Sequence, residues 1–403
     1  MSNFIKVFII YILLYAVLAT WLVHNGYISQ TLMAITKEVF WFWFVIVLMI
    51  IYRKILSQYI SMMYIYYLMF LFLICIWLVV TTFMQSGNAE IYQNIIIWLK
   101  YGILFMWIMM SASFVGFVYK YQNLNYEILI KDILQIVIFF LMIGLFWQWA
   151  KFIWPDFFIK YLWFWPIGDF DFGNPPLYYR TWPGGIARYN WVFSWPNNLW
   201  FLLVLLRSVV IFSKKLWIKL WQKILYVVIC GIVMSRGLIV GVLCQTIIYI
   251  YIQKQYHRYI MGFGSVCILW IVWLSIYKRD STIDHLSLFF ASFDKFLANI
   301  WWYGLGSSGP AVHRHGTILP ENFYLQIMID FGAVWFVGFL GWRSVYIYKQ
   351  YHAIQSDYIY MLLSIGLIWL FVEWLFLHVW EDSMVNYIFM IMYGMSWGYS
   401  LRK

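Results

Sequence analysis

The chain has 403 residues, of which 65% are hydrophobic and only 11% are charged, and its mean hydropathy is +0.78. A soluble globular domain usually carries about 25% charged residues. The composition therefore excludes a soluble enzyme and indicates a protein that is solvated by lipid.

Apolar runs long enough to cross a bilayer, about 20 residues each, recur along the whole chain. We expect an all-α, polytopic fold of about twelve transmembrane helices, in a single integral-membrane domain that covers residues 1–403. No cleaved signal peptide is expected, because the first apolar run is long and lacks a small-residue cleavage site. The expected spans lie near residues 3–22, 39–52, 59–83, 96–119, 131–149, 196–213, 221–234, 237–252, 259–277, 323–342, 358–380 and 383–400.

Lysine and arginine set the expected orientation, because they gather in alternate short loops. The positive-inside rule then makes those loops and both termini cytoplasmic, in a multi-pass protein of the inner (cytoplasmic) membrane. The net charge of +11 is mostly explained by this topology, and no nucleic-acid partner is expected. The cations that remain on the outer side, where the rule predicts few, are Lys151, Lys160, Arg180, Arg188, Arg236, Lys278, Arg279, Lys295 and Arg314.

Two of the expected outer loops are long, at about 150–195 and 278–322. The first is rich in aromatic residues and proline, which is typical of chain that lies against the membrane interface. The second begins with an apolar spacing that predicts an amphipathic helix and continues into the run GLGSSG. Long loops in compact domains are usually functional. The four cysteines show no spacing typical of a disulfide framework or a zinc site.

Arg188 and Arg236 lie at the outer edge of the expected hydrocarbon region. Such arginines usually snorkel to the interface and anchor a helix end, and that interpretation stays open. Two of them on the outer side favour an anionic ligand instead. A guanidinium group binds phosphate in a bidentate manner, so a pyrophosphate on a polyprenyl carrier is the expected ligand.

Glu321 follows Pro320 and opens an apolar helix. This is ordinary chemistry for a helix start, but the same place suits a general base at the lip of a cavity. His313 and Arg314, a few residues earlier, are candidate contacts to a sugar or phosphate. They lack a convincing ligand set for a metal, and no metal or cofactor is expected.

The region 180–345 resembles the superfamily of O-antigen ligases and polymerases. RYNWVFSWPNNL (188–199) resembles the family's pattern of arginine, glycine and then Pro-Asn, and MSRGLIVGVL (234–243) resembles its Ser-Arg span start. The third piece, after GLGSSGPA, has Glu321 and Asn322 followed by nine residues and Gly332. The family carries histidine or glutamate, asparagine, nine residues and glycine at this spacing.

The resemblance implies a role for each matched position. Arg188 and Arg236 would hold the donor's pyrophosphate, and Glu321 would be the base that activates the acceptor hydroxyl. Glutamate in place of the ligases' histidine favours a polymerase. The further residues expected to contact substrate are Arg180, Asn197, Arg279, His285, His313, Arg314 and Asn322.

We expect glycan transfer from a polyprenyl-pyrophosphate donor to a saccharide acceptor on the outer face, with a chain-length regulator as a candidate partner. A ligase that acts on a lipid or protein acceptor remains an alternative, as does a transporter that moves lipid-linked oligosaccharide without chemistry. A structural scaffold would leave the arginines unexplained. No internal repeat typical of a transporter was found.

Tryptophan occupies positions where the family's pattern has glycine. The chain has 27 Trp and 24 Gly, and the affected positions include Trp191, Trp195, Trp302 and Trp335. Glycine is used where the backbone must approach closely or take a positive φ, and an indole cannot replace it. We therefore consider that UGA codons read as glycine in the cell were translated here as tryptophan. The alternative is a lineage rich in interfacial tryptophan.

Overall fold

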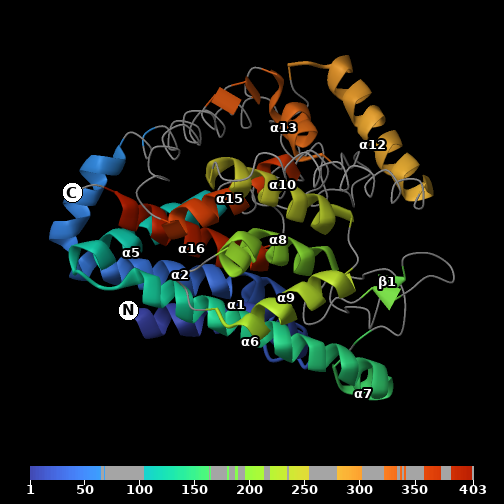
Figure 1. Ribbon diagram of the computed structural model, residues 1–403, viewed down its shortest axis with the longest axis horizontal. Coiled ribbons are helices and arrows are strands. Elements are labelled where there is room, and N and C mark those ends of the chain that lie inside the picture. Colours follow the sequence, from blue (N-terminus) through green and yellow to red (C-terminus); the bar gives the residue numbers. More distant parts are fainter. Residues whose placement is uncertain are drawn as a thin grey trace. The chain divides into compact units, whose positions relative to one another are not determined.

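The prediction of an all-α fold is confirmed by the computed structural model (Figure 1), in which helices dominate the described residues. The structure describes residues 1–64, 68, 104–162, 164, 179–180, 187–188, 196–212, 218–233, 236–253, 279–301, 322–333, 336–337, 340–341, 358–373 and 383–401. The helices are α1 (Ser2–His24), α2 (Gln30–Ile51), α5 (Leu104–Tyr121), α6 (Tyr126–Ile153), α7 (Pro155–Leu162), α8 (Pro196–Phe212), α9 (Leu220–Val233), α10 (Arg236–Gln253), α12 (Arg279–Ala298), α13 (Phe323–Phe331), α15 (Tyr358–Glu373) and α16 (Ser383–Ser400). Two short strands, β1 (Tyr179–Arg180) and β2 (Ala187–Arg188), pair antiparallel.

The chain folds as two compact units. The first unit comprises residues 1–53, 111–242 and 382–399, and the second comprises residues 54–110, 243–381 and 400–403. The resemblance region 180–345 therefore contributes to both units. The single integral-membrane domain that the sequence suggested stays a prediction.

The first unit has a core of helices that are buried along most of their described length. α8, α16 and the part of α5 from Ser111 onward bury nearly every described side chain. α5 and α16 meet at two glycines. A Cβ at Gly116 would lie 1.9 Å from the carbonyl oxygen of Met395, and one at Gly398 would lie 1.7 Å from that of Ser113. The two backbones thus cross with no room for a side chain.

The outer helices of the first unit are tied to one another and to this core by polar contacts. Lys6 of α1 pairs with Asp132 of α6 at 2.5 Å. The indole N–H of Trp41, on α2, donates to the hydroxyl of Ser111 on α5 at 2.8 Å. α6 and α9 are joined by reciprocal hydrogen bonds between the side-chain amides of Gln135 and Gln222.

These outer helices are apolar on their exposed side as well. The exposed stripe of α2 repeats every three or four residues, which is the period of one helix face. The large exposed apolar residues of α2, α6 and α9 are Leu32, Ile35, Val39, Phe40, Trp43, Ile46, Val47, Ile50, Ile51, Ile128, Phe139, Phe146, Trp149, Phe152, Ile153, Leu220, Trp221, Ile224, Val227 and Val228. Soluble monomers rarely expose an apolar patch of this extent.

Most of the described helices lie where the apolar runs predicted them, and the differences that bear on the site are in α2, α6 and α13. α2 begins at Gln30 rather than near residue 39, because Ser29 caps it by accepting a hydrogen bond from the backbone N–H of Leu32 at 3.2 Å. α6 continues to Ile153 and carries Lys151 with it. The expected span 323–342 is interrupted, since α13 ends at Gly332.

By length and composition, α6 is the helix among those described that could cross a membrane alone. The pieces Ile35–Ile51 and Arg53–Tyr64 pass the same test only if they are joined as one broken span. These findings fit a membrane protein, and the number of spans remains a prediction.

Candidate functional site

The residues expected to form the site are described to different extents. Asn322 is described with its side chain. The backbone alone is described for Arg180, Arg188, Asn197, Arg236, Arg279 and His285. Glu321, His313 and Arg314 lie outside the described residues.

The predicted residues also divide between the two units. Arg180, Arg188, Asn197 and Arg236 belong to the first unit, and Arg279, His285 and Asn322 belong to the second. Within the first unit, β1 and β2 bring two of the arginines onto neighbouring strands. Their register pairs Tyr179 with Arg188 and Arg180 with Ala187.

Several of these positions mark the N-terminal ends of helices. Asn197 is the second residue of α8, Arg236 is the first residue of α10, and Arg279 is the first residue of α12. A helix N-terminus has free N–H groups and partial positive charge, and it favours anions over cations. The first turn of α10 contains no acidic residue, so a nearby anion would relieve the unfavourable placement of Arg236.

Helix α13 accounts for the spacing of the third motif. Asn322 is its N-cap, and the side-chain oxygen of Asn322 accepts a hydrogen bond from the backbone N–H of Leu325 at 3.1 Å. Nine residues of helix follow, and Gly332 is the C-cap, with φ of +82°. The pattern of asparagine, nine residues and glycine is therefore a short helix with its two caps.

Gly332 also has a packing role that no other residue could fill. A Cβ at this position would lie 1.5 Å from the carbonyl oxygen of Trp301, just after α12. The next residue, Ala333, donates its backbone N–H to the carbonyl oxygen of Ile300 at 3.0 Å. The positive φ and the close approach both require glycine, and together they hold the end of α13 against the end of α12.

Asp330 and Lys295 bring opposite charges to the packed pair of α12 and α13. Asp330 is buried on α13, and Lys295 is half-buried on α12. Burial lowers the pKa of the Lys295 ammonium, and the nearby Asp330 carboxylate partly opposes that shift. This packing fixes α13, and with it the Asn322 cap that directly follows Glu321.

Asn322 has a structural role as the N-cap of α13, and its expected contact with substrate stays a prediction. Its side-chain oxygen is engaged with the backbone of α13, and the residue is buried. Asparagine is among the preferred N-cap residues, so this assignment was within reach of the sequence. The signal was the polar step Glu321-Asn322 directly before an apolar helix.

Lys151 was expected in an outer loop, and the structure corrects that assignment. Lys151 is fully buried in the last turn of α6, and its Nζ lies 4.6 Å from the centre of the Phe164 ring. Phe158 of α7 and Phe164 form a small apolar cluster there, packed against Trp147. α7 folds back over the end of α6, which explains why the lysine is covered.

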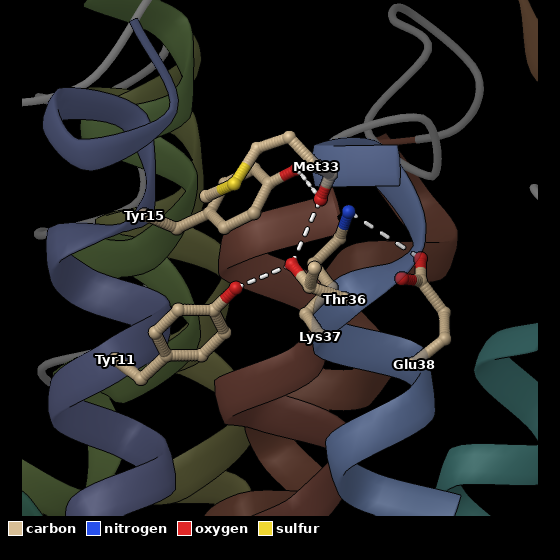
Figure 2. A network of polar contacts seen from close by, with 6 residues as sticks. All are labelled: Tyr11, Tyr15, Met33, Thr36, Lys37 and Glu38. Carbon is tan, nitrogen blue, oxygen red and sulfur yellow. Dashed lines mark hydrogen bonds and ion pairs between the residues drawn. The ribbon is translucent and has the colours of Figure 1, made fainter. Parts of the chain in front are cut away.

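Lys37 and Glu38 were not singled out from the sequence, because they precede an expected span that began at 39. The structure places both on α2, inside the first unit (Figure 2). The signal that could have found them is Ser29, a preferred N-cap residue, followed by apolar residues at helical spacing. Among the described residues, no group of three or more His, Cys, Asp or Glu side chains could hold a metal ion.

Comparison with known proteins gives no relative for this chain. No family model, no curated protein and no solved structure matches it. The site must therefore be interpreted from its own residues.

Proposed function

We propose that the protein is a multi-pass membrane glycosyltransferase that polymerises glycan repeat units from a polyprenyl-pyrophosphate donor on the extracytoplasmic face. Its proposed location is the inner membrane. The proposed catalytic groups are Glu321, Arg188 and Arg236, and the acceptor is the hydroxyl of a sugar.

The membrane location is supported by the exposed faces of the first unit. Its core helices are apolar, and the outer faces of α2, α6 and α9 are apolar too. In water, such faces would cost about 25 cal/mol for each Å² left exposed. A bilayer removes this cost, because lipid chains are as apolar as the side chains they contact.

The single observation that carries the functional proposal is the capped helix α13. The sequence spacing that resembles the O-antigen ligases and polymerases has a physical reason in α13, whose caps are Asn322 and Gly332. In the sequence, Glu321 directly precedes the N-cap Asn322, and we infer that it lies near the positive end of the helix. A carboxylate is favoured at that end and can also act as a base.

In the proposed reaction, Glu321 removes the proton from the acceptor hydroxyl. The oxygen then attacks the anomeric carbon of the donor sugar, and the bond from that carbon to the pyrophosphate oxygen breaks. The polyprenyl pyrophosphate leaves with the electron pair. Arg188 and Arg236 stabilise its charge, and electrostatic assistance of this kind usually contributes most to the acceleration that an enzyme achieves. Attack opposite the leaving group inverts the anomeric configuration.

The placement of Arg236 at the first residue of α10 favours the anionic donor. Phosphate groups bind readily at helix N-termini, where backbone N–H groups and the helix dipole act together. An arginine at the same end adds a bidentate partner. The proposed pyrophosphate subsite needs no metal, because guanidinium and backbone groups supply the positive charge.

A ligase that transfers the glycan once to a lipid or protein acceptor is the main alternative, and a transporter without chemistry is the second. The three differ in their products. A polymerase makes a ladder of lengths, a ligase makes one addition to each acceptor, and a transporter leaves the lipid-linked glycan unchanged.

The test is glycan analysis by gel in cells that lack the gene. The cells are complemented with the native gene, with Glu321→Gln, or with Glu127→Gln, the same change at a carboxylate of α6 outside the motif region. We expect a ladder from the native gene and from Glu127→Gln, and none from Glu321→Gln at equal membrane expression. A ladder from Glu321→Gln would remove this residue from the mechanism. A single-repeat product from the native gene would favour the ligase.

A further inference from the structure

Lys37 and Glu38 form a buried charged pair on α2 (Figure 2). The ammonium nitrogen of Lys37 lies 3.3 Å from Oε1 of Glu38, and the two side chains are 4% and 12% exposed. The same ammonium lies 4.5 Å from the centre of the Tyr15 ring, on α1, and 5.9 Å from that of the Tyr387 ring, on α16. Three helices of the first unit thus surround the positive charge.

The hydroxyl groups of Tyr11 and Tyr15, on α1, bond to Thr36 and to the backbone of Met33 on α2, and not to the Glu38 carboxylate (Figure 2). The hydroxyl of Tyr15 donates to the carbonyl oxygen of Met33 at 2.8 Å. Thr36 donates to the same oxygen at 2.8 Å, so Tyr11, 2.5 Å from the Thr36 hydroxyl, must be the donor in that contact. All three hydroxyl protons are therefore used at Met33 and Thr36.

The Glu38 carboxylate is left without a hydrogen-bond donor in the described part of the chain. Both of its oxygens are buried, and neither has a hydrogen-bond partner there. A buried ion pair repays the loss of water only when its remaining lone pairs are satisfied. The contact with Lys37 satisfies the charge of Glu38 and leaves most of its acceptor capacity unused.

Glu38 lies beside the exposed apolar stripe of α2. Ile35 and Val39, three residues before it and one after it, are both exposed, and the stripe extends further to Leu32. The pair is therefore inside the apolar length of the helix and not at its end. Ionisable residues at such places in membrane proteins usually mark functional sites. Glu38 is the more exposed member of the pair, so it is the one that a molecule on the stripe would reach.

We propose that Lys37 and Glu38 form a binding site for a polar group that carries hydrogen-bond donors, either hydroxyl or primary ammonium. The donors bond to the Glu38 carboxylate after its side chain turns toward the stripe at Ile35 and Val39, while Lys37 keeps the charge balanced. The group comes from a lipid head group or from a saccharide linked to lipid. This inference depends on the membrane location and not on glycan transfer.

The test compares lipids and a saccharide that differ in their hydrogen-bond donors. Phosphatidylethanolamine and phosphatidylcholine share a phosphate, but only the first has N–H donors. The full chain is reconstituted in phosphatidylcholine nanodiscs, alone or with phosphatidylethanolamine, phosphatidylglycerol (hydroxyl donors) or a soluble oligosaccharide. Thermal unfolding gives the Tm, and native mass spectrometry counts the bound lipid.

We expect at least one donor-bearing additive to raise the Tm above that in phosphatidylcholine alone, and the positive arm identifies the source. Glu38→Leu should lose that rise and the retained ligand, whereas Glu127→Gln should keep both. Equal Tm values in all four conditions for the unaltered chain would overturn the proposal, and this comparison needs no variant to fold. A rise that persists in Glu38→Leu would also overturn it.

Discussion

Replacing Asn322 separates two roles that this residue could have in the site. The structure uses its side-chain oxygen to cap α13, through the 3.1 Å hydrogen bond from the N–H of Leu325. The sequence-based expectation was a contact with substrate. Serine can also cap a helix through its hydroxyl, whereas alanine cannot. Asn322→Ser and Asn322→Ala should therefore differ if Asn322 acts as a cap, and should be equally inactive if its amide contacts substrate.

The expected size of the effect follows from the helix. Loss of an asparagine N-cap costs about 1 kcal/mol, which is a change of about fivefold in the equilibrium between the formed and frayed first turn. α13 has only nine residues, and helices this short are marginal on their own. Fraying would move Glu321, which is adjacent in the chain, so Asn322→Ala should lower polymer yield several-fold.

The assay is the glycan ladder of complemented cells, together with the Tm of each purified variant. Asn322→Ser should restore most of the ladder and the Tm, and Asn322→Ala should restore neither fully. A capping role is refuted if Asn322→Ser is as inactive as Asn322→Ala while both variants keep the native Tm. That outcome would assign Asn322 to substrate binding, which requires the amide itself.

Three further predictions concern stability and sequence. Gly116→Ala should lower the free energy of unfolding by about 1–3 kcal/mol, because the added Cβ would meet the backbone of Met395. The measurement is a lower Tm. Gly341→Ala is the matched control, because a Cβ at Gly341 would meet open space. Burial lowers the pKa of Lys295 in the folded protein. Between that lowered pKa and the ordinary lysine pKa of about 10.4, the unfolded chain binds more protons than the folded chain does. The free energy of unfolding should therefore rise as the pH increases through this range. Lys295→Met should flatten that rise in Tm against pH, and an unchanged profile would contradict the assignment. Peptide mass spectrometry of the native protein should find glycine at position 335, and Trp335 observed there would end the recoding hypothesis.

The helices were predictable because long apolar runs carry a strong signal. α8 and α16 begin at the residues where their spans were expected, and α9 and α10 begin within one residue of them. The start of α2 was missed, because Lys37 and Glu38 resemble a loop when nothing shows that they are buried. Burial of a charge depends on the helices around it, which a linear pattern does not contain.

The third motif of the candidate site was visible in the sequence, but the contacts that explain its spacing were not. The spacing of Asn322 and Gly332 was part of the family resemblance, and the structure gives a physical cause for it in the two caps of α13. The break at Gly332 depends on the approach of Trp301, which is distant in the chain. The placement of Lys151 beneath α7 depends in the same way on Phe158 and Phe164.

The most direct test of the central claim is reconstitution of the purified full chain with a lipid-linked repeat unit in nanodiscs. We predict that each glycosidic bond formed releases one polyprenyl pyrophosphate, that the glycan grows on its carrier, and that Glu321→Gln stops both while Glu127→Gln stops neither. Lipid-linked substrate that binds and returns chemically unchanged would contradict the proposed polymerase and leave a transporter as the better description.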